Sequence, residues 1–206
     1  MKIGIFGGSF NPPHKMHLHI AKSLLSRNYV DKVIFVPVSN FYGKKGLVSN
    51  QHRYEMLKRL VKDYPDMEVS NYEFQNKLIY TYETLRHFKE CYSKDEIYFI
   101  CGMDNLEEFH EWRHYEEILS TYQVIVITRN KEVEIPTYLK PYQKNIILAE
   151  THERNISSTS IRNTLLEGKV DENLTDEVYE YIKNNKLYEK ELSLIHISEP
   201  TRPEPR

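Results

Sequence analysis

The chain has 206 residues, of which 40% are hydrophobic and 28% charged, and its formal net charge is −2. This length suits one domain with a sizeable core, and the charge does not favour nucleic acid or an anionic membrane as a partner. No stretch approaches the ~18 apolar residues of a membrane span, and the N-terminal apolar run is too short for a signal peptide. The two cysteines form neither a disulfide framework nor a metal-binding pattern, so we expect reduced thiols in a cytoplasmic protein.

Strand and helix signals alternate from the first residue. Short apolar runs predict buried parallel strands over 2–6, 33–36, 67–70, 96–101, 123–128 and 145–148. Apolar residues at helical spacing predict helices over 14–27, 50–62, 82–91, 115–119, 158–167 and 176–185, the last of them capped by Thr175. This alternation is typical of a single α/β domain of the Rossmann-like, doubly wound type, with a parallel sheet covered on both faces.

The end of the chain differs from the rest. Residues 192–202 read LSLIHISEPTR, which resembles the translation of an adapter used in sequencing libraries. We therefore expect one domain over 1–191, followed by a non-native tail over 192–206 that takes no part in the fold. The alternative is a native proline-rich tail.

A glycine pair and a histidine pair follow the first expected strand, where residues 7–17 read GGSFNPPHKMH. In open α/β sheets ligands bind at the carboxyl ends of the strands, and Gly7 and Gly8 let the backbone turn tightly and approach a ligand. His14 and His17 are three residues apart at the start of the next helix, so their side chains share a face where backbone N–H groups are free. The pattern predicts a phosphate site, although an isolated histidine pair is more often a surface or capping feature.

A second phosphate-binding pattern opens the helix after the last expected strand. Residues 156–162 read ISSTSIR, which provides hydroxyls at a helix N-cap, and Arg162 adds a fixed fork of donors. By itself this pattern is no more than a capped helix. Together with the first pattern, it predicts the second half of one phosphate site.

These two segments resemble the HxGH and ISSTxIR motifs of the nucleotidyltransferase superfamily. Within that superfamily the chain is similar to the bacterial nicotinate mononucleotide adenylyltransferases, from its first residue to about Lys190. Residues 102–104 (GMD), followed by Trp112, resemble the G-x-D…W segment of these enzymes. Residues 80–84 (YTYET) resemble their acceptor segment.

The resemblance implies a reaction and a role for each matching residue. AMP would pass from ATP, accompanied by Mg²⁺, to nicotinate mononucleotide, giving nicotinate adenine dinucleotide and pyrophosphate for NAD biosynthesis. No dedicated metal ligands are expected, because Mg²⁺ leans on substrate phosphates. The catalytic residues would be His14, His17 and Arg162. The ATP-binding residues would be Gly7, Gly8, Ser9, Phe10, Ser157, Ser158 and Thr159. The acceptor-binding residues would be Lys44, Thr81, Asp104 and Trp112, with Asp104 on a ribose and Trp112 stacked on the pyridine ring.

The chain departs from the family pattern at Met16 and in the loop over 40–47. Met16 stands where the family usually has glycine. It lies between the histidines and need not share their face, but a bulky side chain there could crowd the phosphates. The loop over 40–47 lacks the usual segment, and Lys44 and Lys45 could supply its cation. With Arg53, these lysines could equally form a solvated basic edge.

Other functions remain open at this point. Phosphopantetheine adenylyltransferases typically have threonine in place of His14 and lack the spacing between Asp104 and Trp112. A preference for nicotinamide mononucleotide, or a nucleotide-binding module in which Met16 has abolished chemistry, would share the same motifs. A Rossmann dehydrogenase is disfavoured because the first turn lacks G-x-G-x-x-G. The sequence also leaves the oligomeric state open, a homo-oligomer included.

Overall fold

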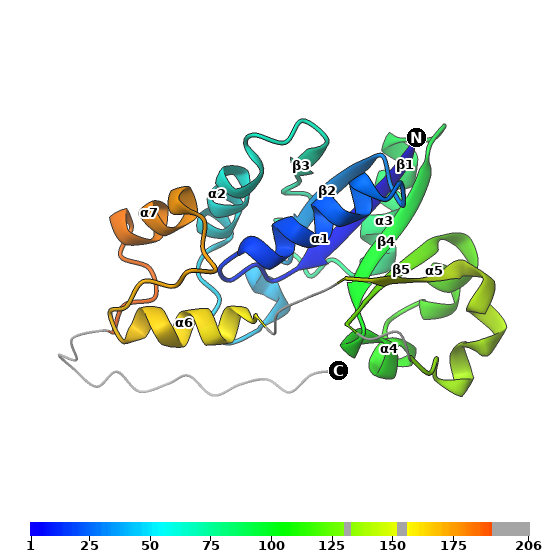
Figure 1. Ribbon diagram of the computed structural model, residues 1–206. Helices are drawn as coiled ribbons and strands as arrows, with labels where there is room; N and C mark the ends of the chain where they lie inside the picture. Colours follow the sequence, from blue (N-terminus) through cyan, green and yellow to red (C-terminus); the bar gives the residue numbers. More distant parts are fainter. Residues whose placement is uncertain (130–132, 152–155, 191–206) are drawn as a thin grey trace.

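The computed structural model describes residues 1–129, 133–151 and 156–190 (Figure 1). Six parallel strands form one sheet in the order β3-β2-β1-β4-β5-β6. Their bounds are β1 Lys2–Gly8, β2 Lys32–Pro37, β3 Met67–Val69, β4 Glu96–Gly102, β5 Gln123–Thr128 and β6 Ile146–Glu150. The chain moves outward from β1 to β3 and then crosses to β4 on the other side of β1. This order confirms the predicted Rossmann-like, doubly wound sheet.

The helices alternate with the strands as predicted. Their bounds are α1 Lys15–Ser26, α2 Asn50–Val61, α3 Thr81–Cys91, α4 Asp104–Glu108, α5 Tyr115–Thr121, α6 Ser158–Leu166 and α7 Asp176–Asn184. Every strand and helix that the sequence predicts is present to within two residues at each end. Helix α4 and three 3₁₀ segments, η1 Asn40–Tyr42, η2 Phe109–Glu111 and η3 Thr137–Asn145, were not predicted.

The alternation of side chains along the strands builds two apolar layers. In β1, Ile3 and Ile5 lie in the layer that includes buried residues of α3, α4 and α5, whereas Phe6 lies in the layer with α1, α2, α6 and α7 (Figure 1). Both faces of the sheet are therefore covered, which is why the strands read as nearly continuous apolar runs.

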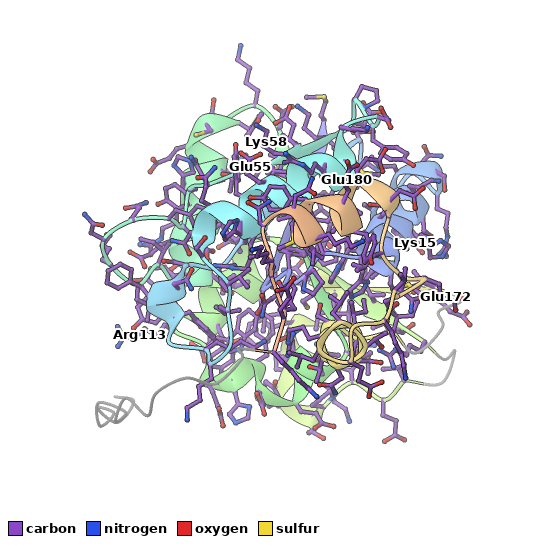
Figure 2. All side chains as sticks on the ribbon, turned by 90° about the vertical axis from the view of Figure 1, so that its left-hand side faces the viewer. Lys15, Glu55, Lys58, Arg113, Glu172 and Glu180 are labelled. Atoms are coloured by element: carbon purple, nitrogen blue, oxygen red, sulfur yellow. The ribbon has the colours of Figure 1, made fainter. Side chains whose placement is uncertain are left out.

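Helix α7 closes one side of the domain. Thr175 caps it by accepting a hydrogen bond from the Val178 N–H at 3.4 Å. Its buried Val178 and Ile182 lie in the same apolar layer as α2, and the helix packs along α2 (Figure 2). In the part of the chain that the structure describes, no helix is long and apolar enough to cross a membrane. The predicted tail over 192–206 lies outside the described residues.

Candidate active site

The carboxyl ends of the central strands surround a cavity of about 760 Å³. Its polar wall is formed by segments that follow β1, β4 and β5 and by the start of α6: His14, His17, Asp104, Arg129, Glu134, Ser157 and Ser158. Its apolar wall includes Phe6, Met16, Ile20, Ile127 and Ile156. The strand order reverses here, between β1 and β4, which is where open α/β sheets bind ligands. Such a cavity can pack a planar ring on one wall and bind phosphates with the other.

The two predicted phosphate motifs meet at this cavity, although they are far apart in sequence. The Ser158 hydroxyl donates a hydrogen bond to the Pro12 carbonyl at 2.9 Å, and Arg162 Nη1 donates to the Asn11 carbonyl at 2.7 Å. Ser157 caps α6 by accepting from the Ser160 N–H at 3.1 Å. The first turn of α6 is thus tied to the loop that leads into α1.

His14 and His17 stack on one another, with 3.8 Å between their ring centroids. His14 caps α1, because its Nδ1 accepts from the Met16 N–H at 3.3 Å. In turn, the His14 N–H donates to Nδ1 of His17 at 3.1 Å. Since both Nδ1 atoms accept, the neutral rings carry their protons on Nε2. Each ring therefore keeps one N–H donor for a ligand in the cavity that both rings line.

Burial keeps these two rings uncharged. It lowers the pKa of His14 to about 4, against a weaker opposing attraction from Asp171. Burial, together with the neighbouring His14, also holds the pKa of His17 well below its usual range. The pair therefore provides neutral hydrogen-bond donors at pH 7, and two stacked imidazolium rings are avoided.

The backbone donors at the start of α1 are occupied, contrary to the sequence-based expectation. The Lys15 N–H donates to the Asn173 carbonyl at 2.8 Å, and the Met16 N–H is bonded to His14. This end of α1 therefore offers imidazole donors to a ligand. The first N–H groups of a helix have no intrahelical acceptor. Because those of α1 are bonded to Asn173 and His14, the first turn of α6 is the better source of backbone donors.

Met16 reaches the cavity despite its position between the histidines. Its side chain is 9% exposed, packs in the apolar layer and lines the main cavity. It also lines a smaller cavity of about 320 Å³ with Lys15, His19 and Glu172. Lys15 and Glu172 lie at the same edge of the molecule (Figure 2). The expectation that position 16 need not share the face of the histidines is therefore wrong, because the methionine folds inward to bury its chain.

The first turn is made by Phe10 and not by the glycines. Gly7 and Gly8 lie within β1, opposite residues of β2, and a Cβ on Gly8 would lie 3.1 Å from the Phe10 ring. Phe10 has the left-handed φ of 47°. The residue is 2% exposed, with its ring among apolar side chains, and this burial offsets the unfavourable backbone conformation.

The cationic residues near Ser9 have different surroundings. Lys44 Nζ donates to the Ser9 hydroxyl at 3.0 Å, so the lysine that we expected to bind the acceptor contacts the loop after β1. Arg53 does not belong to a solvated basic edge, because it is 0% exposed. Its donors bind the carbonyls of Ser9 and Val48 and the side chains of Asn40 and Asn50. Burial lowers the pKa of Arg53 to about 10, which leaves the guanidinium charged at neutral pH.

The residues expected on the acceptor side are only partly assembled around the cavity. Asp104 lines it, and a Cβ at position 102 would lie 2.7 Å from Asp104 Oδ1, so a side chain there would displace this carboxylate. Trp112 is half-buried and stacks on Phe109, with 4.6 Å between the ring centroids. Trp112, Thr81, Thr159, Arg162, Lys44 and the segment 7–10 do not line the cavity themselves.

Sequence reasoning missed three polar residues of this region: Asn11, Arg129 and Glu134. Arg129 follows β5 directly and brings a cation to the cavity wall. Its position after a predicted strand was the available signal. Asn11 is buried in the loop before His14, and its side chain contacts segments that the sequence does not connect to it.

Within residues 1–129, 133–151 and 156–190, no group of three or more His, Cys, Asp or Glu side chains could hold a metal ion. Both cysteines are free thiols: Cys91 is exposed, and burial raises the pKa of Cys101 to about 12. A buried thiol of this kind is unreactive.

Residues 5–164 match the family model described as cytidylyltransferase-like. The chain belongs to the cytidylyltransferase-like family. Among members similar to it, a "Probable nicotinate-nucleotide adenylyltransferase" of Carboxydothermus hydrogenoformans is 42% identical over 91% of this chain and 98% of the relative. A protein of the same description from Clostridium acetobutylicum is 39% identical over 91% of this chain and 98% of its own length.

Solved structures agree on the fold of the family. A Plasmodium falciparum nicotinic acid mononucleotide adenylyltransferase complexed with NaAD superposes with a TM-score of 0.74 at 21% identity. The superposition covers 91% of this chain and 97% of the other. The cytidylyltransferase-like fold is thus retained where most side chains differ.

Proposed function

We propose that this protein is a nicotinate-nucleotide adenylyltransferase. It transfers AMP from ATP to nicotinate mononucleotide and releases pyrophosphate and nicotinate adenine dinucleotide. The observation that carries this proposal is the 42% identity over 91% of the chain to a relative described by that activity. The convergence of both phosphate motifs on one cavity supports the same proposal, and this support does not depend on how the relative is described.

The chemistry requires positioning and charge stabilisation. An oxygen of the acceptor's 5′-phosphate attacks the α-phosphorus of ATP in line, and the bond from that phosphorus to the oxygen of pyrophosphate breaks. No covalent intermediate with the protein forms. In such transfers the protein mainly aligns the reacting groups and stabilises charge on the phosphoryl oxygens.

On the ATP side, the Nε2–H groups of His14 and His17 donate to phosphate oxygens and stabilise the charge that develops during transfer. Arg162 adds a cation: a guanidinium has five N–H donors, and within the described residues its hydrogen bonds to Asn11 and Thr159 use two of them. The remaining ATP contacts come from the N-terminus of α6, through Ser157, Ser158 and Thr159. They also come from the end of β1 and the start of the loop that follows it, through Gly7, Gly8, Ser9 and Phe10.

On the acceptor side, Asp104 accepts hydrogen bonds from ribose hydroxyls. Trp112 offers its half-exposed ring for stacking on the pyridine, and its contact with Phe109 keeps that ring in a fixed orientation. Lys44 and Thr81 complete the acceptor subsite, with Lys44 near the loop through Ser9. Arg129, which sequence reasoning missed, adds a cation on the cavity wall.

Magnesium enters as part of the ATP substrate. Mg²⁺ usually takes few protein ligands where it can bind substrate phosphates. The two free thiols also suit a cytoplasmic enzyme.

The substitution His17→Ala tests this assignment of roles. Removing one charge-stabilising donor typically costs ~10²–10³ in rate, so we expect at least a hundredfold loss of pyrophosphate release with an unchanged circular dichroism spectrum. His19→Ala, an exposed histidine of the same helix, is the matched control and should keep nearly full turnover. Near-normal turnover in folded His17→Ala protein would refute the proposed role.

A further inference from the structure

Side chains from distant parts of the chain hold the loop before His14, and they include Arg53, Arg162 and Tyr188. Arg53, from α2, donates to the Ser9 carbonyl at 3.0 Å. Arg162, from α6, donates to the Asn11 carbonyl at 2.7 Å. The hydroxyl of Tyr188, beyond the end of α7, donates to Asn11 Oδ1 at 2.6 Å. Two of these residues have catalytic or structural explanations already, whereas Tyr188 has none.

The side chain of Asn11 connects this loop to the segment that carries Lys44. Its Oδ1 accepts from the Val48 N–H at 3.2 Å as well as from Tyr188, and its Nδ2 donates to the Gly46 carbonyl at 2.8 Å. Asn11 is 3% exposed, so water does not replace a hydrogen-bond partner that its side chain loses. The orientation of Asn11 therefore affects the loop before the histidines and the loop of the acceptor lysine together.

The backbone turn around Tyr188 places its ring beside Asn11. After α7 the chain turns back through Lys186 and Tyr188, whose φ angles of 52° and 56° are left-handed and unfavourable for residues other than glycine. The phenol of Tyr188 lies near the guanidinium groups of Arg53 and Arg162. Burial raises its pKa despite these cations, so the phenol remains a hydrogen-bond donor.

We propose that Tyr188 is a positioning residue of the active site, which acts through Asn11 to fix the loop before His14 and the segment over 44–48. This inference rests on the proposed function for its catalytic consequence. Its structural part, the restraint of Val48 by Asn11 and of Asn11 by Tyr188, does not depend on the identity of the reaction.

The first test compares Tyr188→Phe with Tyr181→Phe. Tyr181 also donates or accepts one hydroxyl hydrogen bond, to His52 Nδ1 at 2.8 Å, but this bond joins α7 to α2. We expect Tyr188→Phe to lower kcat by roughly fivefold to tenfold, the scale of one neutral hydrogen bond. The KM for ATP should change by less than about twofold. Tyr181→Phe should keep kcat within about twofold. Equal losses in the two variants, or a wild-type kcat in Tyr188→Phe, would overturn the proposal.

A double-mutant cycle asks whether Tyr188 acts through Asn11. In an Asn11→Ala background, Tyr188→Phe should have no further effect on kcat, since the partner of the hydroxyl is already gone. Multiplicative losses would overturn the proposed route. If Asn11→Ala does not fold, Asn11→Ser provides the same test with a smaller change.

Amide hydrogen exchange provides a measurement that needs no substrate. We expect the Val48 N–H to exchange at least about fivefold faster in Tyr188→Phe than in wild type, with no change in Tyr181→Phe. Unchanged exchange in Tyr188→Phe would overturn the structural part of the inference. A wild-type protein without turnover on nicotinate mononucleotide would instead refute the proposed function, and the exchange result would stand apart from it.

Discussion

The buried histidine at the start of α1 makes the stability of the fold sensitive to acid. Burial lowers the pKa of His14 from 6.5 to about 4, so in the folded protein the ring resists protonation. The unfolded chain takes up this proton first as the pH falls below about 6.5, and unfolding is favoured. The stability that depends on a neutral His14 is thus present above pH 6.5 and is lost progressively as the pH falls toward about 4.

The size of this effect follows from the two pKa values. Between neutral pH and about pH 5, the free energy of unfolding should fall by about 2 kcal/mol on account of His14 alone. His14→Asn removes the titration and keeps the cap, because asparagine is among the preferred N-cap residues. Glu73, whose pKa burial raises to about 7, acts in the opposite direction, but it does so equally in both proteins.

Urea unfolding, measured at several pH values between 4.5 and 7.5, checks this prediction. The wild-type protein should lose about 2 kcal/mol more than His14→Asn on going from pH 7 to pH 5. His19→Asn, on the exposed side of the same helix, should follow the wild-type protein. If wild type and His14→Asn have the same pH dependence, the neutral buried imidazole is wrong, and with it the protonation state that we assign to the cavity.

Three further substitutions probe the residues around the site. Arg53→Ala removes a fully buried guanidinium and its four hydrogen bonds, and should lower the free energy of unfolding by roughly 3–5 kcal/mol in urea, whereas a loss below about 1 kcal/mol would contradict the burial of that side chain. Glu73 binds a proton more tightly in the folded protein, so the stability of the wild-type protein falls as the pH rises from about 4.5 through 7. Glu73→Gln can still accept from Thr84 and should be about 3 kcal/mol more stable than wild type at pH 8.5. The same gain at pH 4.5 would argue against this titration. Met16→Ala should lower stability by about 2 kcal/mol in calorimetry but retain turnover, because the hydrogen bonds of the histidines do not use that side chain; complete loss of turnover in the folded variant would contradict this.

The sheet and most helices could be predicted because their signals are local and repeated. The run QVIVIT over 123–128 coincides with β5, since a strand buried on both faces must be apolar along its length. Helix α4 escaped prediction because its five residues bury only Leu106 and provide no period. Segment η3 includes Pro141, which argues against a helix in any sequence-based scheme.

The site also has features that the sequence predicts and features that it does not. The stacking of His14 and His17 could be predicted because it needs only a spacing of three residues at the start of one helix. The burial of Arg53 could not be predicted, because nothing in the local sequence distinguishes Arg53 from a surface arginine. One of its acceptors, the Ser9 carbonyl, lies 44 residues away in the sequence. The same holds for the bond from Tyr188 to Asn11, which spans 177 residues. The left-handed turn at Phe10 was missed because two glycines beside it offered a simpler explanation.

The reaction itself is tested most directly by incubating the protein with ATP and Mg²⁺ and following pyrophosphate release. Nicotinate mononucleotide, nicotinamide mononucleotide and phosphopantetheine would be offered separately, with the dinucleotide product identified by mass. We predict rapid release and nicotinate adenine dinucleotide with the first acceptor, and much slower release with the other two. Measurable ATP binding without release with any acceptor would contradict the assignment and favour a nucleotide-binding module in which Met16 blocks the chemistry.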